Sequence, residues 1–195
     1  SLSRREDLDE TVELVAKEGR RAVGIVADVR DLASLQAAAE QAVGEFGGID
    51  AAVFNAGIWS PCAQTWSLDE DDWVTMIDVN LTGQWRSVKA IAPAMVERGG
   101  GAIVLVSSMN GLKASHGNGH YTSAKHGLIG LMKTLAIELA GHGIRVNAVC
   151  PTGVKTPMLM NENLYGMFRP DLEVPTFADC EEGLAGLNLQ PVAAI

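Results

Sequence analysis

The chain has 195 residues, 47% of them hydrophobic, and its 24 acidic and 15 basic side chains give a formal net charge of −9 at pH 7. This acidic balance excludes a nucleic-acid partner and an anionic membrane surface, because both require a basic face on the protein. Length and composition indicate one globular domain over residues 1–195, large enough to hold a sizeable core.

The cysteines and the apolar stretches indicate the compartment. Cys62, Cys150 and Cys180 include no C-x-x-C pair, so neither a disulfide framework nor a thiolate zinc site is indicated. No uncharged apolar stretch is long enough to span a membrane, and the charged residues 1–9 have no apolar signal core. We therefore expect a protein of the cytoplasm with no membrane partner.

Hydrophobic periodicity predicts alternating helices and strands in the first part of the chain. A first helix ends at Gly19, and a strand follows over residues 22–27. The next helix carries an apolar stripe from Leu32 to Phe46 and ends at Gly47. A glycine directly after each helix is typical of a C-terminal cap.

The same alternation continues further along the chain. A strand is predicted over residues 49–54, and Ser67 with Glu70 has the spacing of a capping box, which predicts a helix from Ser67 to Gly99. The remaining pattern predicts a strand, a helix and a strand over residues 102–106, 121–139 and 144–149.

Four nearly all-apolar strands alternating with helices predict a doubly wound α/β fold, with a parallel sheet covered on both faces. Ligands of such sheets bind at the carboxyl ends of the strands. The polar residues that gather at these ends are Asp28, Asn55, Ser107, Ser108 and those after Pro151. We therefore expect the functional site at this edge.

Tyr121 and Lys125 stand four positions apart at the start of a predicted helix, so their side chains project from the same face. A phenol ionises near pH ~10, and acid–base work at neutral pH needs a pKa about three units lower, which is roughly 4 kcal/mol. A positive charge ~4 Å away supplies about this free energy at an effective dielectric constant of ~20. We predict that Lys125 lowers the pKa of Tyr121; simple packing on a helix surface is the alternative.

Ser108 directly follows a predicted buried strand and precedes Tyr121 by thirteen residues. From this position its hydroxyl could donate to a substrate oxygen while the tyrosine proton moves. A serine that caps the following turn is the alternative.

The ordered motifs of the chain resemble those of the short-chain dehydrogenase/reductase family. They are Asn55-Ala56-Gly57, Asn80-Leu81-Thr82-Gly83, the strand end Ser107-Ser108, Tyr121-Thr122-Ser123-Ala124-Lys125 and the segment from Ile144 to Pro151. Five motifs in the right order are more specific than any one of them. The resemblance implies a Rossmann-like fold and an NAD(P)-dependent oxidoreductase acting on a CH–OH group; a non-catalytic Rossmann-like binding or assembly module is the alternative.

The resemblance also implies a role for each matching residue. Tyr121 would be the catalytic acid/base, Lys125 its activator and a ligand of the nicotinamide ribose, and Ser108 would orient the substrate oxygen. Asn80 would interrupt its helix so that its backbone carbonyl holds a water in a proton relay to Lys125. The residues implied to contact the cofactor are Asp28 and Val29 at the adenine, Asn55, Ala56 and Gly57 along the groove, and Pro151, Val154 and Thr156 near the carboxamide and pyrophosphate.

Further segments, above all residues 154–158 and 167–172, resemble the carveol dehydrogenase-like, mycofactocin-associated branch of the family. This resemblance implies NAD as cofactor and a small hydrophobic secondary alcohol or ketone as substrate. Residues 156–178 would form a mobile lid, and the residues beside the substrate would be His120, Met158, Met167 and Phe168. Packing of this stretch against the core or a partner subunit is the alternative.

The first two strands of the family, its glycine-rich dinucleotide turn and its last strand are not found in the sequence. Gly117-Asn118-Gly119 cannot replace the turn, because it does not follow a strand. We therefore expect a piece of a longer enzyme, with an intact mass above 20.6 kDa. The sequence does not separate NAD from NADP, because the discriminating residue normally ends the second strand.

Two further expectations concern metals and assembly. His116, His120 and His126 lie close in sequence, but no acidic or cysteine partner completes a metal-ligand spacing, so no metal site is expected. By resemblance, the helices that start near Ser67 and Tyr121 would form the contacts of a homodimer or homotetramer.

Overall fold

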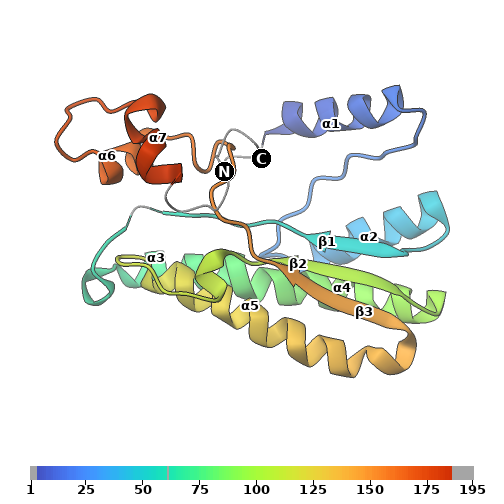
Figure 1. Cartoon of the computed structure of the whole chain (residues 1–195). Coiled ribbons are helices and arrows are strands. Elements are labelled where there is room, and N and C mark those ends of the chain that lie inside the picture. Colours follow the sequence, from blue (N-terminus) through green and yellow to red (C-terminus); the bar gives the residue numbers. More distant parts are fainter. Residues whose placement is uncertain (1–3, 61, 186–195) are drawn as a thin grey trace.

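The structure is a computed structural model that describes residues 4–60 and 62–185. Its sheet has three parallel strands, β1 (Ala51–Phe54), β2 (Gly101–Val106) and β3 (Ile144–Val149), with β2 in the middle. This confirms three of the four predicted strands and their parallel direction. All three carboxyl ends therefore meet at one edge of the sheet (Figure 1).

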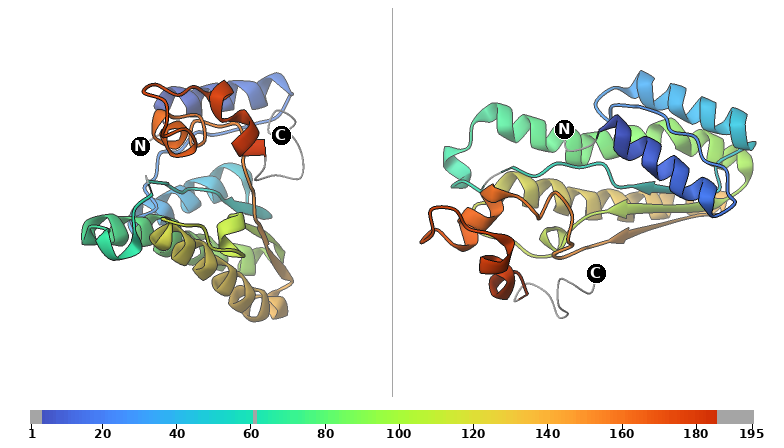
Figure 2. Two further views of the ribbon diagram at one scale, coloured as in Figure 1. Left: turned by 60° about the vertical axis from the view of Figure 1, so that its left-hand side comes forward. Right: turned by 90° about the horizontal axis from the view of Figure 1, so that it is seen from above.

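The helices form layers on the two sides of this sheet (Figures 1 and 2). On one side lie α2 (Leu32–Phe46), α4 (Gly83–Arg98) and α5 (Gly119–Glu138). On the other side lies α1 (Arg5–Lys17), whereas α6 (Glu162–Phe168) and α7 (Phe177–Ala185) lie on that side beyond the carboxyl ends of the strands. Parallel strands between helical layers give the predicted doubly wound α/β architecture.

The main core lies between β2, β3 and the inner faces of α4 and α5. Ile103 of β2 is fully buried and stands opposite Val146 of β3 in the register of the sheet. The buried members of this core are Val88, Met95, Ile103, Leu105, Leu135, Leu139, Ile144 and Val146. Full burial of a large aliphatic side chain contributes about 1.5–3 kcal/mol, so this core holds the strand ends in place.

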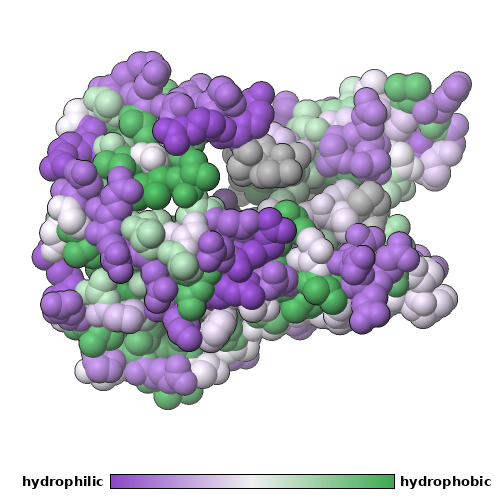
Figure 3. Space-filling model, turned by 180° about the vertical axis from the view of Figure 1, so that it is seen from behind, coloured by the Kyte–Doolittle hydropathy of each residue, from purple (hydrophilic) through white to green (hydrophobic). Residues whose placement is uncertain are grey.

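The prediction of a strand over residues 22–27 is wrong. The segment has no strand pairing, and Val26 is 70% exposed. A strand needs a neighbour for its backbone hydrogen bonds, and within residues 4–60 and 62–185 β1 pairs with β2 alone. Hydrophobic side chains are accordingly visible in the hollow beneath α1 (Figure 3).

The predicted capping box at Ser67 is also wrong. Ser67 belongs to a 3-10 turn, Thr65–Ser67, and its hydroxyl donates to the Gln64 carbonyl at 2.9 Å. The helix α3 (Glu70–Ile77) starts three residues later and has Asp69 at its N-cap. The serine satisfies the preceding turn, so it is not available to cap the helix.

The predicted interruption of the long helix at Asn80 is confirmed. A π-helical turn, Asp78–Thr82, joins α3 to α4. Such turns displace a backbone carbonyl from the regular hydrogen-bond ladder and are frequent at functional sites. Gly99, with φ of 87°, ends α4 as predicted. Two further 3-10 turns lie at Met109–Gly111 and Ala140–His142.

Candidate active site

A cavity of about 670 Å³ opens at the carboxyl ends of the three strands. Its walls come mainly from the segments at the ends of β1, β2 and β3, from the first two turns of α5 and from α6, with Asp7 of α1. The predicted site residues that line it are Asn55, Ala56, Gly57, Ser108, Tyr121, Lys125, Pro151, Val154, Thr156 and Met158. Its volume lies within the range of small-molecule sites.

Lys125 is the buried cation of this cavity, with only 5% of its surface exposed. Its Nζ donates to the carbonyl oxygen of Val106, the last residue of β2, at 3.0 Å. Loss of water around the ammonium lowers the pKa of Lys125 from 10.5 to about 8, and the nearby Cys150 opposes this change. The side chain is therefore held in place by the sheet and still carries its charge at pH 7.

Tyr121 shares the face of α5 with Lys125, whose Nζ lies 5.5 Å from the centre of the phenol ring. Burial raises the pKa of Tyr121, and its hydrogen bond with Ser108 partly offsets this increase. The prediction that Lys125 lowers this pKa is therefore wrong for this structure. The ammonium sits over the ring and bonds to the Val106 carbonyl, so desolvation of the phenol dominates.

The two serines after β2 make different contacts. Ser107 is buried, and its hydroxyl donates to the Lys125 carbonyl at 2.9 Å, which fastens α5 to the strand end. Ser108 lines the cavity, and its Oγ accepts a hydrogen bond from the Asn110 amide at 3.1 Å. Ser108 thus caps the following turn, as the alternative predicted, and its side chain also bonds to Tyr121. Its contact with a substrate oxygen stays a prediction.

Asn80 lies directly behind the cavity and is fully buried. Its Oδ1 accepts from the Ile58 amide and its Nδ2 donates to the Ile58 carbonyl, both at 2.8 Å. A Cβ on Gly57 would lie 2.8 Å from this Oδ1 and 3.7 Å from Lys125 Nζ. Glycine at position 57 therefore leaves the cavity open beside the lysine.

Two residues implied at the adenine lie outside the lining of this cavity. Asp28 forms an ion pair with Arg30 (2.6 Å), which lowers the pKa of its carboxyl group to about 2. Val29 packs against Gly83, where an added Cβ would meet its side chain at 2.9 Å.

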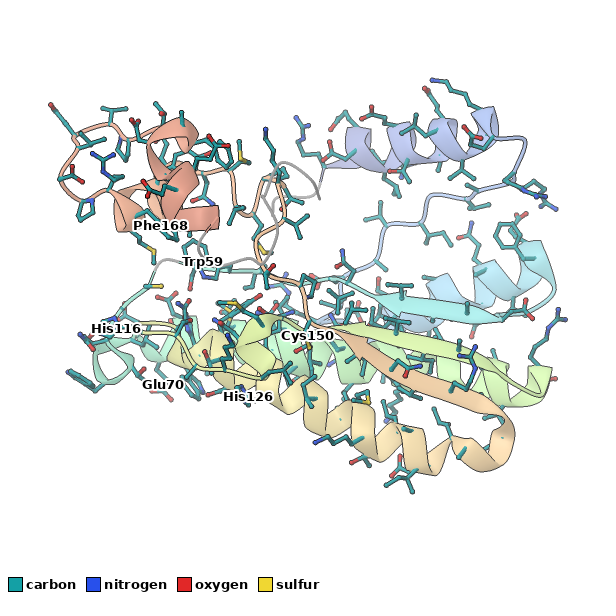
Figure 4. The ribbon with its side chains drawn as sticks, in the orientation of Figure 1. Trp59, Glu70, His116, His126, Cys150 and Phe168 are labelled. Carbon is teal, nitrogen blue, oxygen red and sulfur yellow. The ribbon has the colours of Figure 1, made fainter. Side chains whose placement is uncertain are left out.

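Three residues expected beside the substrate also lie away from the lining. His120 is fully buried and its Nε2 lies 2.8 Å from Ser60 Oγ, so it faces the protein interior. Met167 is 42% exposed, and Phe168 packs with α7 (Figure 4). Met158 is the one member of this predicted group that lines the cavity.

The cavity has further walls that the motifs did not predict. Asp7, Ile58, Trp59 and Val106 are the lining residues outside the predicted motifs and lid, whereas Ser107, Thr152, Pro157, Leu159 and Leu164 lie in the strand-end and lid segments where the site was expected. Ile58 and Trp59 could have been found, because they directly follow the predicted Asn55–Gly57 motif at a strand end. The approach of Asp7 depends on the tertiary fold and leaves no signal in the local sequence.

Residues 4–60 and 62–185 contain no group of three or more metal-ligating side chains. None of the helices in these ranges is long and apolar enough to cross a bilayer.

Comparison with known proteins gives consistent matches. A family model described as short chain dehydrogenase matches residues 2–165. A putative short-chain type dehydrogenase/reductase of Mycolicibacterium smegmatis is 52% identical over 171 residues, which cover 87% of this chain and 61% of that protein. A (-)-trans-carveol dehydrogenase of Rhodococcus erythropolis is 46% identical over 193 residues, covering 98% of this chain and 69% of that protein.

A crystal structure of carveol dehydrogenase from Mycobacterium avium in complex with NAD superposes with a TM-score of 0.94 at 45% identity. The match covers 97% of this chain and 69% of that one. The chain thus spans between 61% and 69% of the length of these three proteins.

Proposed function

Since the chain belongs to the short-chain dehydrogenase family, we propose that it acts as an NAD-dependent oxidoreductase on a hydrophobic secondary alcohol or ketone, of the carveol kind. One observation carries the proposal: Ser108, Tyr121 and Lys125 meet in one cavity at the strand ends. The names of the carveol dehydrogenase relatives support the class of substrate and the choice of NAD.

Each of these side chains has a distinct task in the proposal. Protonated Tyr121, whose pKa is raised by burial, donates its proton to a ketone oxygen, and the tyrosinate left by this step takes the proton of an alcohol in the reverse direction. The Ser108 hydroxyl orients the same substrate oxygen. Lys125 provides a fixed positive charge beside the phenol, and the π turn at Asn80 leaves a backbone carbonyl available for a water that relays protons to Lys125.

The cavity also fits the nicotinamide part of the cofactor. Gly57 leaves space where a Cβ would meet Asn80, and the Lys125 ammonium stands 3.7 Å from that point. Bound NAD supplies the acceptor or donor of the hydride. The residues proposed to hold it are Tyr121 and Lys125 at the ribose, Asn55, Ala56 and Gly57 along the groove, Pro151, Val154 and Thr156 near the carboxamide and pyrophosphate, and Asp28 and Val29 at the adenine.

We propose that residues 156–178 form a lid over the substrate. This segment contains α6, which packs on α7 through a separate small cluster around Tyr165 and Cys180. Met158, Leu159 and Leu164 from this segment line the cavity. Apolar walls of this kind favour the hydrocarbon part of an alcohol.

We also propose a homodimer or homotetramer in the cytoplasm. Large apolar side chains are exposed on and beside α3 and α4, among them Trp66 (86%), Val74 (54%) and Trp85 (45%), and they suit a subunit contact. Cys62, Cys150 and Cys180 are free thiols, as in proteins of a reducing compartment. Sedimentation equilibrium measures the assembly, and a monomer at all concentrations would contradict it.

Conservative removal of the tyrosine hydroxyl tests the proposed function. With NAD and a cyclic secondary alcohol, Tyr121→Phe is expected to lower kcat/KM by about 10²–10⁴. Tyr165→Phe is the matched control, because its hydroxyl lies near the Met160 sulfur in the α6–α7 cluster and not in the cavity. Nicotinamide absorbance reports turnover, with an artificial electron acceptor added in parallel.

Unchanged turnover in Tyr121→Phe would remove the proposed mechanism. A wild-type protein that binds NAD but oxidises no alcohol with either acceptor would favour the non-catalytic binding module instead.

A further inference from the structure

The segment that follows β1 is fastened to the start of α5. Three hydrogen bonds join the two segments: Trp59 Nε1 to Asn118 Oδ1 at 3.0 Å, Ser60 Oγ to His120 Nε2 at 2.8 Å, and the Ala63 amide to the Gly117 carbonyl at 3.0 Å. All three reach residues within four positions of Tyr121. The wall of the cavity after β1 is therefore tied to the helix that carries Tyr121.

Asn118 has a position that would normally cap α5, but its side chain makes no hydrogen bond with the first turn of that helix. Its Nδ2 donates instead to Ser115 Oγ (3.3 Å) and to the His116 carbonyl (3.2 Å). An indole N–H can only donate, so the Oδ1 of Asn118 must face Trp59. The bonds of Nδ2 hold this buried amide in place, and its Oδ1 in turn fixes the orientation of the Trp59 ring.

Trp59 is half-buried and lines the same cavity as Ser108 and Tyr121. In Figure 4 it lies on the segment after β1, with Phe168 of α6 above it in this view. The other apolar walls of the cavity come from Ile58, Val154, Pro157, Met158, Leu159 and Leu164. Methionine and leucine side chains can change rotamer, whereas the indole is planar and tethered.

We propose that Trp59 is a specificity-determining residue, whose ring forms a flat, fixed wall that selects ring-containing alcohols over open-chain alcohols of the same size. This inference rests on the proposed function of the cavity. A rigid ring contacts a flat wall along one whole face without losing internal rotations. An open chain must be ordered before it makes the same contact, and this ordering opposes binding.

Equilibrium binding of two ten-carbon secondary alcohols tests the inference without requiring turnover. Titration calorimetry compares 4-tert-butylcyclohexanol with decan-2-ol, each added to the whole chain with and without NAD. The wild-type protein is expected to bind the cyclic alcohol roughly tenfold more tightly, a ratio typical of apolar pocket discrimination. In Trp59→Leu the ratio of the two dissociation constants is expected to fall close to one. In Trp59→Phe, which keeps a flat ring, part of the preference for the cyclic alcohol should remain.

Two further variants separate the wall from general effects. Asn118→Ala keeps the indole but removes the hydrogen bond that holds it. Its ratio of dissociation constants is therefore expected to fall between those of the wild type and Trp59→Leu. Trp66→Leu is the matched control, because Trp66 is 86% exposed and does not line the cavity. Its ratio should equal that of the wild type.

Equal loss of affinity for both alcohols in Trp59→Leu, or an unchanged ratio, would overturn the inference. Equal binding of the two alcohols by the wild-type protein would also overturn it, even where the protein oxidises both. Selective binding without any oxidation would leave Trp59 as the selective wall and would count against the proposed function alone.

Discussion

Replacement of Lys125 by methionine is expected to change how the stability of the protein depends on pH. The ammonium is 5% exposed, and burial lowers its pKa from 10.5 to about 8. Methionine has a similar length and apolar stem but no proton to exchange. The comparison of the two proteins therefore isolates the titration of this one group.

The sign follows from proton linkage. Between pH 8 and 10.5 the unfolded lysine holds its proton and the folded lysine has lost it, so the free energy of unfolding rises with pH over this window. A pKa difference of about 2.5, at about 1.36 kcal/mol per unit, gives roughly 3 kcal/mol at the upper end. Below pH 8 Lys125 is protonated in both the folded and the unfolded protein. Its burial then lowers the free energy of unfolding by an amount that does not change with pH.

Urea unfolding of the wild type and of Lys125→Met at several pH values between 7 and 10 measures this difference. Most of the expected gain, roughly 2–3 kcal/mol, should have developed by pH 10. Lys133→Met is the matched control, because Lys133 is exposed on the same helix and its replacement should leave the pH dependence unchanged. The free energy of unfolding of the wild type minus that of Lys125→Met should rise with pH. A difference that stays constant, or that falls with rising pH, would refute the reasoning.

Two further substitutions test the packing behind the cavity, and a third, in α2, is their control. Gly57→Ala places a methyl group 2.8 Å from Asn80 Oδ1 and is expected to lower the free energy of unfolding by about 1–3 kcal/mol and to weaken NAD binding. Gly44→Ala in α2, where a Cβ meets nothing within 4 Å, should raise stability by about 0.5–1 kcal/mol, and equal effects of the two changes would contradict the account. Ser107→Ala removes the donor to the Lys125 carbonyl and should cost about 1–2 kcal/mol in the same assay; an unchanged unfolding midpoint would speak against it.

The elements that could be predicted from sequence are those whose signals are local. The Asp31 side chain accepts from the Ala33 amide at the start of α2, and Gly47, with φ of 79°, ends the same helix. The apolar runs after residue 100 became β2 and β3 because each has a strand neighbour. Local capping and periodicity therefore sufficed for these elements.

The features that were not predicted depend on tertiary contacts. The segment over residues 22–27 has the composition of a strand but no partner for its backbone. The pKa of Tyr121 moves opposite to the prediction because the depth of burial is not visible in sequence. His120 and Trp59 both flank recognised motifs, yet only the fold turns the histidine inward and the indole into the cavity.

Hydride transfer from a labelled alcohol tests the central claim most directly. A cyclic secondary alcohol carrying deuterium on its carbinol carbon is incubated with NAD and the protein, and mass spectrometry locates the label. The account predicts deuterium in the reduced nicotinamide with the wild-type protein and a strongly reduced yield with Tyr121→Phe. An unlabelled nicotinamide, or the same yield from both proteins, would contradict it.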